Sequence, residues 1–462
     1  MATINPNIFR EYDIRGVVEQ DLPTDVVVQL GKGIGTYLKR QGASKFTIGR
    51  DGRLTSERIA NDLKEGLRST GLEITDVGMC PTAVLYFSVP HLQVDGGIMI
   101  TGSHNPPEFN GIKMALGKTA VFGPQIQQIR RFIEEEDLER HPAPDAKTYK
   151  ILDPYVEYLS QNLKLDRSVR MAMDSGNGVG GLVAPQIFRA LGATVYDLYS
   201  EVDGTFPNHH PDPTVEKNLA DLKKVVAEKN LEVGVGFDGD ADRLGAIDRN
   251  GKVIWGDQLM ILFARSILKN HPGATIIADV KCSENFFADV KKHGGNPLMW
   301  KTGHAHIKNK LWAETALLAG EMSGHLFFAD RYFGFDDGIY AAGRLVEIVS
   351  RLDHPLDEEL SDLPPAFNTP EIRVDCPDEV KFDLVDKVKA SFKKKGYETI
   401  DLDGVRVKFD NGWGLARASN TQPTLVLRFE ANSPEGLKKI ENEFREVLDQ
   451  EGGFKLVVSE GH

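Results

Sequence analysis

FTIGRDGRLTSERIANDLKEGLRSTGLEI, residues 46–74, reads as a strand, a turn, a helix and a second strand. The apolar residues 46–49 predict the first strand, and the spacing of apolar residues across 58–68 predicts the helix. Gly71 follows as a stop signal, and a second strand is expected from Leu72. A unit of this kind forms two parallel strands joined by a right-handed crossover.

The same pattern occurs twice more along the chain. The second copy covers residues 169–195 and the third covers 275–299, with Gly192 or Gly294 between the expected helix and the second strand. In open α/β sheets, ligand sites form beyond the carboxyl ends of the strands. We therefore expect three similar α/β domains with mixed, mainly parallel sheets, whose loops meet at a central cleft.

The last part of the chain has a different pattern. After residue 366, a strand and an amphipathic helix at 384–395 are followed by short strands that are interrupted at Asp403-Gly404 and Asn411-Gly412. Such pairs favour tight hairpins. A C-terminal α+β domain with an antiparallel sheet is therefore expected.

Ser103 lies in the segment TGSHNPPEFNGIK, residues 101–113, directly after the apolar run 97–100. The two prolines exclude helix, and the two glycines permit sharp chain reversal, so we expect the serine to be exposed and rigidly held at the end of a strand. Such a placement suits a nucleophile in covalent catalysis. An ordinary surface turn is the alternative interpretation.

Three aspartates at alternate positions stand between two apolar runs. They are Asp238, Asp240 and Asp242. Alternation puts their carboxylates on one side of an extended segment, where they repel one another unless a cation lies among them. Oxygen ligands favour Mg2+, and a calcium-binding EF-hand is excluded because Arg243 and Arg249 occupy the positions that require Gly and Glu. A solvated acidic turn is the alternative.

Two further polar loops lie beside predicted strands: GEMSGH at 320–325 and RASNTQP at 417–423. In the first loop, Glu321 and Ser323 alternate and are suited to vicinal sugar hydroxyl groups. In the second, the Arg417 guanidinium and its polar neighbours would hold a phosphate group from several directions. Each loop, taken alone, also fits a plain turn.

Two other motifs are interpreted as structural. The glycine-rich residues 176–181 follow a strand and open a helix, but their spacing differs from that of a dinucleotide-binding fingerprint, so a helix-packing turn is favoured. Residues 206–213, FPNHHPDP, contain adjacent histidines without further metal ligands at useful spacing. A structural loop is favoured there as well.

Together these loops resemble those of the α-D-phosphohexomutase superfamily, and specifically of its phosphomannomutase/phosphoglucomutase branch. The resemblance covers essentially the whole chain and rests on six motifs: EYDIRG at 11–16, TGSHNPP at 101–107, DGDADR at 238–243, KTGH at 301–304, GEMSGH at 320–325 and RASNT at 417–421. The chain departs from the family pattern at Phe237, Ala241 and Met322. Of these, Met322 could alter sugar preference.

The resemblance implies an isomerase of carbohydrate metabolism, a phosphoprotein that interconverts the 1- and 6-phosphates of mannose, glucose or both. Ser103 would carry phosphate as a monoester, beside one Mg2+ held by a phosphate oxygen and the three aspartates. The phosphoserine would pass its group to a hexose monophosphate, and the resulting bisphosphate would turn round and return its other phosphate. Glucose 1,6-bisphosphate or mannose 1,6-bisphosphate would act as the activator.

The resemblance also implies roles for individual residues. The implied catalytic residues are Ser103, Lys113, Arg15, Arg243 and His325. The implied metal ligands are Ser103, Asp238, Asp240 and Asp242. The implied substrate-binding residues are Tyr12, Lys281, His304, Glu321, Ser323, His325, Arg417, Ser419, Asn420 and Thr421. The group that exchanges a proton with the sugar hydroxyl stays open among His325, Lys113, Arg15 and His304.

Length and composition favour several domains, since 462 residues at roughly 100–200 per domain predict three or four. Pro-rich segments at 141–145 and 363–366 suggest two linkers, and Asn250-Gly251 marks the middle boundary. The expected domains are 1–148 with the phosphoserine loop, 149–252 with the metal-binding loop, 253–365 with the sugar-binding loop and 366–462 with the phosphate-binding loop.

Three other functions are weighed against the mutase. Phosphoglucosamine mutase is the nearest competitor within the family, and the motifs at 320–325 and 419–421 argue against it. A metal-dependent phosphomonoesterase would hydrolyse its phosphoserine. A noncatalytic sugar-phosphate sensor would have no reason to combine a nucleophile, a metal site and a phosphate grip.

Charge and cysteine content restrict location and partners. A formal net charge of −13 disfavours binding to nucleic acid or to anionic membranes. Three widely spaced cysteines indicate reduced thiols, and no signal peptide or transmembrane segment is recognised, so a cytoplasmic protein is expected. The expected partners are small hexose phosphates, with the protein itself a monomer or homodimer.

Overall fold

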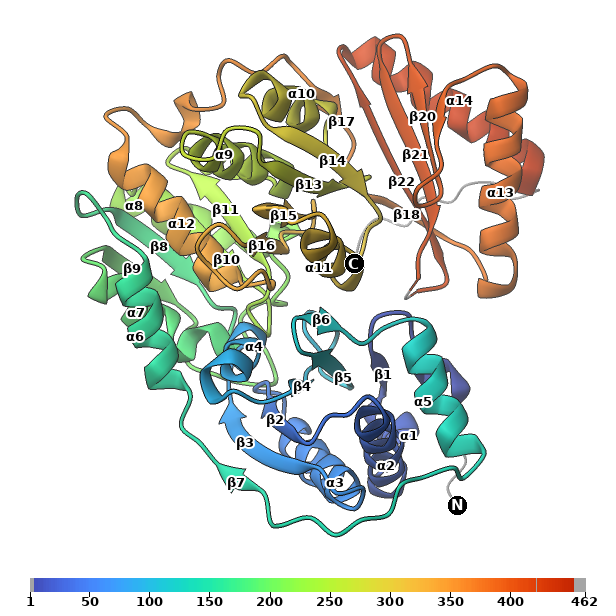
Figure 1. Ribbon diagram of the computed structural model, residues 1–462. Coiled ribbons are helices and arrows are strands. Elements are labelled where there is room, and N and C mark those ends of the chain that lie inside the picture. Colours follow the sequence, from blue (N-terminus) through green and yellow to red (C-terminus); the bar gives the residue numbers. More distant parts are fainter. Residues whose placement is uncertain (1–3, 421, 453–462) are drawn as a thin grey trace.

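The computed structural model describes residues 4–420 and 422–452. Within these residues the strands form four sheets, which follow one another along the chain. Figure 1 shows the four units as an arc, from the blue N-terminal unit through green and olive to the red C-terminal unit. The first three sheets are mixed α/β sheets and the fourth is antiparallel, so the predicted fold class is confirmed.

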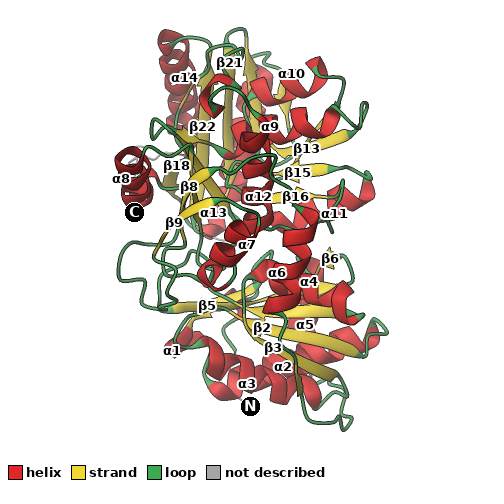
Figure 2. Cartoon of the chain, turned by 90° about the vertical axis from the view of Figure 1, so that its left-hand side faces the viewer, coloured by secondary structure: helices red, strands yellow, loops and turns green. Residues whose placement is uncertain are grey.

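The first unit contains η1 (Pro6–Ile8), β1 (Ile14–Val17), α1 (Val18–Asp21), α2 (Thr24–Arg40), β2 (Lys45–Arg50), α3 (Ser56–Arg68), β3 (Glu73–Met79), α4 (Thr82–Leu92), β4 (Gly96–Ile100), β5 (Phe109–Leu116), β6 (Thr119–Ala120), α5 (Pro124–Glu134) and β7 (Lys147–Thr148). The strand order is β1-β5-β4-β2-β3-β7, with β6 paired to β5. In β4, Ile98 and Ile100 join the apolar core around α3, whereas Met99 joins the core around α4. Helices therefore cover both faces of this sheet (Figure 2).

The second unit contains α6 (Leu152–Asn162), β8 (Arg170–Asp174), η2 (Val179–Leu182), α7 (Ala184–Ala190), β9 (Thr194–Leu198), η3 (Glu216–Leu219), α8 (Ala220–Lys229), β10 (Val233–Phe237), β11 (Leu244–Asp248) and β12 (Val253–Ile254). Its strand order is β12-β11-β10-β8-β9. The short strand β12 follows the expected boundary at residue 252, yet it pairs with β11 inside the second sheet. The turn at Asn250-Gly251 therefore joins two paired strands.

The third unit contains α9 (Gly256–Leu268), β13 (Thr275–Asp279), α10 (Glu284–Lys292), β14 (Asn296–Trp300), α11 (His304–Ala313), β15 (Leu318–Gly320), β16 (Leu326–Phe328), α12 (Gly338–Arg351) and η4 (Leu356–Glu358). Its strand order is β14-β13-β15-β16. Helix α12 also contacts β10 and β11 of the second unit. The second and third units thus pack against each other through this helix.

The fourth unit contains β17 (Phe367–Asn368), β18 (Ile372–Asp375), α13 (Asp378–Lys394), β19 (Thr399–Ile400), β20 (Val405–Phe409), β21 (Gly412–Ala418), β22 (Thr424–Ala431) and α14 (Pro434–Gly452). The β20–β21 hairpin closes tightly at Asp410-Asn411, close to the predicted pair. The hairpin at Asp403-Gly404 is wider than predicted, since Ile400 and Arg406 are its last paired residues. Helix α13 begins earlier than predicted, at Asp378.

The three strand–helix–strand repeats are confirmed as parallel pairs. They are β2 with β3, β8 with β9, and β13 with β14. The glycine after each helix has a positive φ: 87° at Gly71, 88° at Gly192 and 77° at Gly294. Glycine adopts this conformation without steric cost, so the chain turns from the helix into the next strand at these positions.

One apolar core extends through the first three units. It includes Leu85 from α4, Phe188 from α7, Phe263 from α9 and Leu345 from α12, all buried. The fourth unit has its own core between its sheet and the helices α13 and α14. Among the described helices, none is both long and apolar enough to cross a membrane. The shared core holds the loops of the first three units in place relative to one another.

Candidate active site

Ser103 lies in the connection between β4 and β5. Its hydroxyl donates a hydrogen bond of 2.9 Å to Asp238 Oδ2 and lies 3.1 Å from His104 Nδ1. The predicted exposure is wrong, because only 3% of Ser103 is accessible to solvent. The second unit packs against this loop so closely that a Cβ atom on Gly239 would lie 2.5 Å from the Ser103 carbonyl oxygen. The serine is held at an interface between two units.

The three aspartates lie in the connection between β10 and β11. Asp238, Asp240 and Asp242 are fully buried, and one carboxylate oxygen from each lies within 4.8 Å of the others. The interpretation as an extended segment is wrong, because the chain turns at Ala241, where φ is 57°. This turn, rather than strand alternation, brings the carboxylates together.

Residues of the first unit compensate part of this negative charge. Lys113 Nζ donates to Asp240 Oδ2 at 2.9 Å and to Asp242 Oδ2 at 2.6 Å. The hydroxyls of Thr82 and Thr101 also donate to Asp240 Oδ2, at 2.6 and 3.1 Å. Burial lowers the pKa of Lys113, but the two carboxylates raise it well above its usual value. Lys113 is therefore positively charged at neutral pH.

The aspartate cluster fits a divalent cation. Asp240 Oδ1 and Asp242 Oδ1 are buried and accept no hydrogen bond from the described residues. Burial, with Asp242 and Asp240 nearby, raises the pKa of Asp238 well above its usual value. Three buried carboxylates that converge on one another provide oxygen ligands, which match a hard ion such as Mg2+.

His325 joins the aspartate loop to the loop between β15 and β16. His325 Nδ1 lies 3.0 Å from Glu321 Oε2, and its Nε2 lies 3.3 Å from Asp242 Oδ1. Burial lowers the pKa of His325, whereas these two carboxylates raise it to about 9. Arg243 Nε lies 3.3 Å from His325 Nε2 and 3.8 Å from Asp238 Oδ2. The predicted residues Arg243 and His325 therefore lie beside the aspartates.

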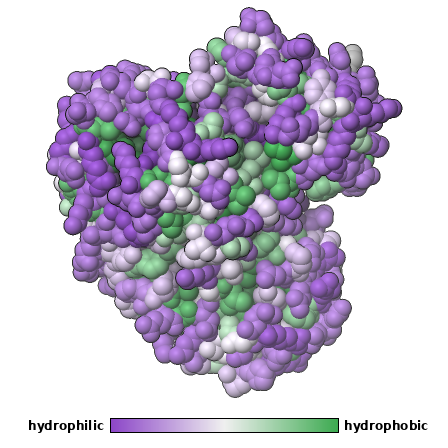
Figure 3. Space-filling model, turned by 45° about the horizontal axis from the view of Figure 1, so that its top comes forward, coloured by the Kyte–Doolittle hydropathy of each residue, from purple (hydrophilic) through white to green (hydrophobic). Residues whose placement is uncertain are grey.

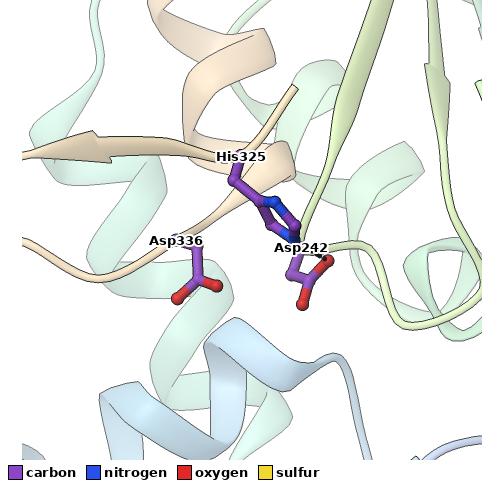
Figure 4. Close-up of side chains that lie close together, drawn as sticks. All are labelled: Asp242, His325 and Asp336. Atoms are coloured by element: carbon purple, nitrogen blue, oxygen red, sulfur yellow. Dashed lines mark ion pairs between the residues drawn. The ribbon is translucent and has the colours of Figure 1, made fainter. Parts of the chain in front are cut away.

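Asp336 is a site residue that the sequence did not suggest. Figure 4 shows its carboxylate beside Asp242 and His325, and ligand atoms of the three lie within 4.8 Å of one another. Asp336 precedes Asp337, which caps α12, so two neighbouring aspartates have different environments. Lys308 Nζ lies 2.7 Å from Asp336 Oδ1 and compensates its charge. A pair of aspartates before a helix signals a cap, and nothing in it distinguishes the first residue.

The predicted sugar-binding residues gather next to His325. Glu321 Oε1 accepts a hydrogen bond of 2.6 Å from the Gly303 amide, and Ser323 Oγ lies 3.3 Å from His325 Nδ1. The His304 ring lies 5.7 Å from the His325 ring. Burial lowers the pKa of His304 to about 4. These side chains provide hydrogen-bonding groups of both kinds beside the aspartates.

Two predicted substrate-binding cations, Lys281 of the third unit and Arg417 of the fourth, each pair with a carboxylate of the fourth unit. Arg417 Nε donates to Asp403 Oδ2 at 2.9 Å, and Lys281 Nζ donates to Glu371 Oε2 at 3.1 Å. Both cations are buried. Ser419 Oγ accepts a hydrogen bond of 3.1 Å from the Gln422 amide. This bond links two residues of the Arg417 loop just before β22.

Tyr12 connects the first unit to the third and fourth. Its hydroxyl donates to the Thr302 carbonyl at 3.0 Å and accepts from Asn420 Nδ2 at 2.9 Å. Thr421, also predicted to bind phosphate, lies outside the described residues. Arg15 lies at the serine loop instead, where its guanidinium donates to Asn105 Oδ1 at 3.0 Å.

The predicted residues thus form two groups. One group surrounds Ser103 and the aspartates, and the other comprises Tyr12, Lys281, Arg417 and Asn420. Figure 3 shows a notch on the right-hand side of the molecule, between the lobes that Figure 1 colours red and blue. The arrangement offers a nucleophile with a cation-binding cluster at one end and buried cations with polar groups at the other.

The two motifs interpreted as structural have packing contacts. In the 176–181 turn, a Cβ atom on Gly181 would lie 2.0 Å from the Ser200 carbonyl oxygen, so only glycine fits. In the 206–213 loop, His209 Nε2 lies 3.0 Å from Asp174 Oδ2, at the end of β8. Both observations agree with the structural interpretation.

Four family models match successive parts of the chain. They are described as phosphoglucomutase/phosphomannomutase alpha/beta/alpha domain I, matching residues 6–140, domain II, matching 153–251, domain III, matching 255–367, and the C-terminal domain, matching 371–447.

Individual relatives match over nearly their whole length. A phosphomannomutase/phosphoglucomutase of Pseudomonas aeruginosa is 43% identical over 446 residues, which cover 96% of each chain. A phosphoglucomutase of Neisseria gonorrhoeae is 42% identical, covering 97% of this chain and 98% of the relative. A crystal structure of a phosphoglucomutase/phosphomannomutase family protein from Burkholderia thailandensis is 42% identical, with a TM-score of 0.92, and covers 98% of this chain and 100% of that one.

Proposed function

The chain belongs to the phosphoglucomutase/phosphomannomutase family, and we propose on this basis that it interconverts hexose 1-phosphates and hexose 6-phosphates through a phosphoserine at Ser103. It is a phosphohexomutase, and thus an isomerase. The observation that carries the proposal is the hydrogen bond of 2.9 Å from Ser103 Oγ to Asp238 within the buried aspartate cluster. Relatives at 42–43% identity carry the mutase names, so phosphoglucosamine mutase and phosphomonoesterase are not favoured.

Ser103 would alternate between an alcohol and a phosphate monoester. In the first half-reaction, the free hydroxyl of a hexose monophosphate attacks the phosphorus atom, and the bond to Ser103 Oγ breaks. In the second half-reaction, Ser103 Oγ attacks the phosphorus atom of the other phosphate, the bond from that phosphorus to the sugar oxygen breaks, and a hexose monophosphate is left. Asp238, which accepts the hydrogen bond from Ser103 Oγ, is placed to hold the hydroxyl for this attack.

Asp238, Asp240 and Asp242 would hold one Mg2+, together with an oxygen on Ser103. Bound Mg2+ would neutralise negative charge on the transferring phosphoryl group. Thr82, Thr101 and Lys113 bind Asp240 Oδ2 and leave Oδ1 without a partner, which supports Oδ1 as a ligand atom.

Arg243, Arg15 and Lys113 would stabilise charge on the phosphoryl group. His325 contacts both the aspartate loop and the sugar loop, through Asp242 and Glu321. This intermediate position supports His325 as the group that exchanges a proton with the sugar hydroxyl. Lys113, Arg15 and His304 are the other candidates for that role.

The far group of residues would hold the phosphate that is not reacting. Arg417, Lys281, Ser419, Asn420 and Thr421 would bind this phosphate, and Tyr12 would support the loop through Asn420. Glu321 and Ser323 would bind the 3- and 4-hydroxyls, which a sugar presents in both orientations. The bisphosphate must turn round in the site between the two half-reactions. Since a bisphosphate phosphorylates Ser103 in the second half-reaction, glucose 1,6-bisphosphate or mannose 1,6-bisphosphate would serve as activator.

A single assay tests this function. The protein is incubated with mannose 1-phosphate, Mg2+ and a trace of glucose 1,6-bisphosphate, and the products are separated. Formation of mannose 6-phosphate supports the mutase. Release of inorganic phosphate without isomerised product would indicate a phosphomonoesterase, and no turnover would indicate a sensor.

A further inference from the structure

We propose that Arg53 is a positioning residue that fixes the backbone of the Ser103 loop for phosphoryl transfer. Arg53 lies in the turn after β2, and its side chain has no exposed surface. Among the described residues, Arg53 forms no hydrogen bond with Asp238, Asp240 or Asp242, and none with the predicted sugar-binding residues. The proposal rests on the proposed function of Ser103 and assigns the structural cause of its placement.

One guanidinium group donates to four carbonyl groups of the same loop. Arg53 Nη1 donates to the Pro106 carbonyl at 2.6 Å and to the Phe109 carbonyl at 3.0 Å. Arg53 Nη2 donates to the Ser103 carbonyl at 2.8 Å and also to the Asn105 carbonyl. These carbonyls converge on one buried cation from both ends of the connection between β4 and β5.

Asp51 completes the arrangement from the same turn. Its Oδ2 accepts a hydrogen bond of 3.0 Å from the Gly102 amide and lies 3.3 Å from Arg53 Nε. Its Oδ1 accepts from the Arg53 amide at 3.0 Å. The turn after β2 therefore holds the serine loop in two ways: the Asp51 carboxylate binds the Gly102 amide, and the Arg53 guanidinium binds carbonyl groups from Ser103 onward.

The loop has few donors for its own carbonyl groups, because Pro106 and Pro107 have no amide hydrogen. Within the loop, the Asn105 amide donates to the Gly102 carbonyl at 2.9 Å and the Phe109 amide to the Pro106 carbonyl at 3.0 Å. Buried carbonyl groups require hydrogen-bond partners. Ser103 also has a φ of 49°, a conformation that side chains other than glycine rarely adopt and that persists where surrounding contacts determine it.

The contact with Arg53 also decides which way one backbone amide faces. The described chain has no cis peptide bonds, and in a trans peptide the carbonyl and the following amide point in opposite directions. The Ser103 carbonyl faces Arg53, so the His104 amide faces away from it. No described residue accepts a hydrogen bond from this amide. It is therefore a donor left free next to the residue that would carry phosphate.

The second unit covers Arg53 from outside. The Phe206 ring lies 5.4 Å from the Arg53 guanidinium carbon, and a Cβ atom on Gly204 would lie 2.5 Å from the Gly52 carbonyl oxygen. A Cβ atom on Gly102 would lie 2.3 Å from the same guanidinium. The cation is thus enclosed by the serine loop on one side and by the 206–213 loop on the other.

Lysine cannot replace this side chain. A guanidinium group presents five N–H donors in a rigid plane, whereas an ammonium group presents three donors at a single point. The four carbonyls bind two different nitrogen atoms of Arg53. Arg53→Lys is therefore expected to keep the charge and lose the geometry.

The test compares Arg53→Lys and Arg53→Ala with Arg344→Ala. Arg344 is also buried and binds Asp330 through both terminal nitrogens at 2.9 Å, but it lies on α12, outside the site. The melting temperature, kcat and KM for a hexose 1-phosphate, and the backbone hydrogen exchange of residues 101–110 without substrate are measured for each variant.

We expect both Arg53 variants to lose kcat by about 100-fold, with KM within about twofold, because a misplaced nucleophile slows transfer without weakening substrate binding. Exchange in 101–110 should increase in both. Arg344→Ala should lower the melting temperature and leave kcat and exchange in 101–110 unchanged. Added guanidinium ion should restore part of the kcat of Arg53→Ala. As a control, Arg344→Ala is assayed at a temperature where it unfolds, and there guanidinium ion should restore none of its activity.

A folded Arg53→Lys with wild-type kcat would overturn the proposal, as would unchanged exchange in residues 101–110. If Arg53→Ala does not fold, Arg53→Lys decides the question. The proposed function is tested separately, since the wild-type protein must first isomerise the substrate, whereas the exchange measurement needs no substrate and reports on the loop alone.

Discussion

Ser103 and Asp238 are 135 positions apart in the chain, and the Ser103 hydroxyl donates a hydrogen bond of 2.9 Å to Asp238 Oδ2. Each residue follows a strand of a different sheet, β4 in the first unit and β10 in the second. The contact depends on the core that the first three units share, because that core sets the distance between the two loops. Nucleophile and cation-binding cluster are therefore assembled by packing between units.

Replacing Ser103 by alanine should abolish phosphorylation of the protein. Incubation with a hexose 1,6-bisphosphate should add roughly 80 Da to the wild-type chain and nothing to Ser103→Ala, as intact-mass spectrometry would show. Ser88→Ala is the matched control, since Ser88 is a buried serine that bonds to Thr47 instead. A mass increment that survives in Ser103→Ala would place the nucleophile elsewhere.

Replacing Asp240 by asparagine should weaken Mg2+ binding by roughly tenfold or more, because the change removes a negative charge from the cluster while keeping its shape. Calorimetric titration with Mg2+ measures this without substrate. Asp248→Asn is the control, because the Asp248 side chain lies outside the cluster and accepts hydrogen bonds from the turn amides of Asn250 and Lys252. An Asp240→Asn titration identical to that of wild type would rule out the cluster as the metal site.

Replacing Arg417 by alanine should raise KM with a smaller effect on kcat, since this residue is proposed to bind the phosphate that does not react. Loss of a charge-assisted hydrogen bond costs about 1.5–3 kcal/mol, or roughly 10- to 100-fold in affinity. Lys408→Ala, an exposed cation of the same unit that pairs with Glu398, serves as the control. Wild-type KM in Arg417→Ala would exclude the Arg417 loop from the site.

Glu371 should make the free energy of unfolding depend on pH. Burial raises its pKa, but Lys281 and Arg373 lower it, to about 2. The folded-state pKa is thus below the unfolded value of 4.5, so the stabilisation is complete above pH 4.5 and is lost as the pH falls toward 2. At pH 7, Glu371→Gln should be less stable by about 1–3 kcal/mol.

Urea denaturation of wild type and Glu371→Gln at pH 7, 5 and 3 measures this effect. The stability difference should be the same at pH 7 and pH 5 and should shrink at pH 3, because protonated glutamate resembles glutamine. A difference that grows on acidification would contradict the assignment. Glu398→Gln is the control, since Glu398 is an exposed partner of Lys408 and should change little at any pH.

Local patterns in the chain were enough to predict the fold class. The strand 46–49, the helix 58–68 and the glycine at 71 all appear where hydrophobic periodicity and backbone preference indicate them, and the two further copies behave alike. These signals act over neighbouring residues, so they can be read without knowledge of the rest of the chain. The loops that carry Ser103 and the aspartates were found for the same reason.

Features that depend on distant contacts were predicted wrongly or missed. Ser103 was expected to be exposed, and Gly239 of another unit covers it. Asp336, whose carboxylate lies beside Asp242 and His325, was not identified from the sequence. Arg53, which binds four carbonyls of the serine loop, resembles any polar turn residue in the sequence.

Chain order and side-chain chemistry alone thus identify the elements and the reactive groups, because these follow from interactions within a few residues. The distance between the serine and the carboxylates, their burial and the direction of the backbone groups around them follow from how three sheets pack on one core. That packing is the sum of many weak contacts between residues far apart in the chain, and no short segment encodes it.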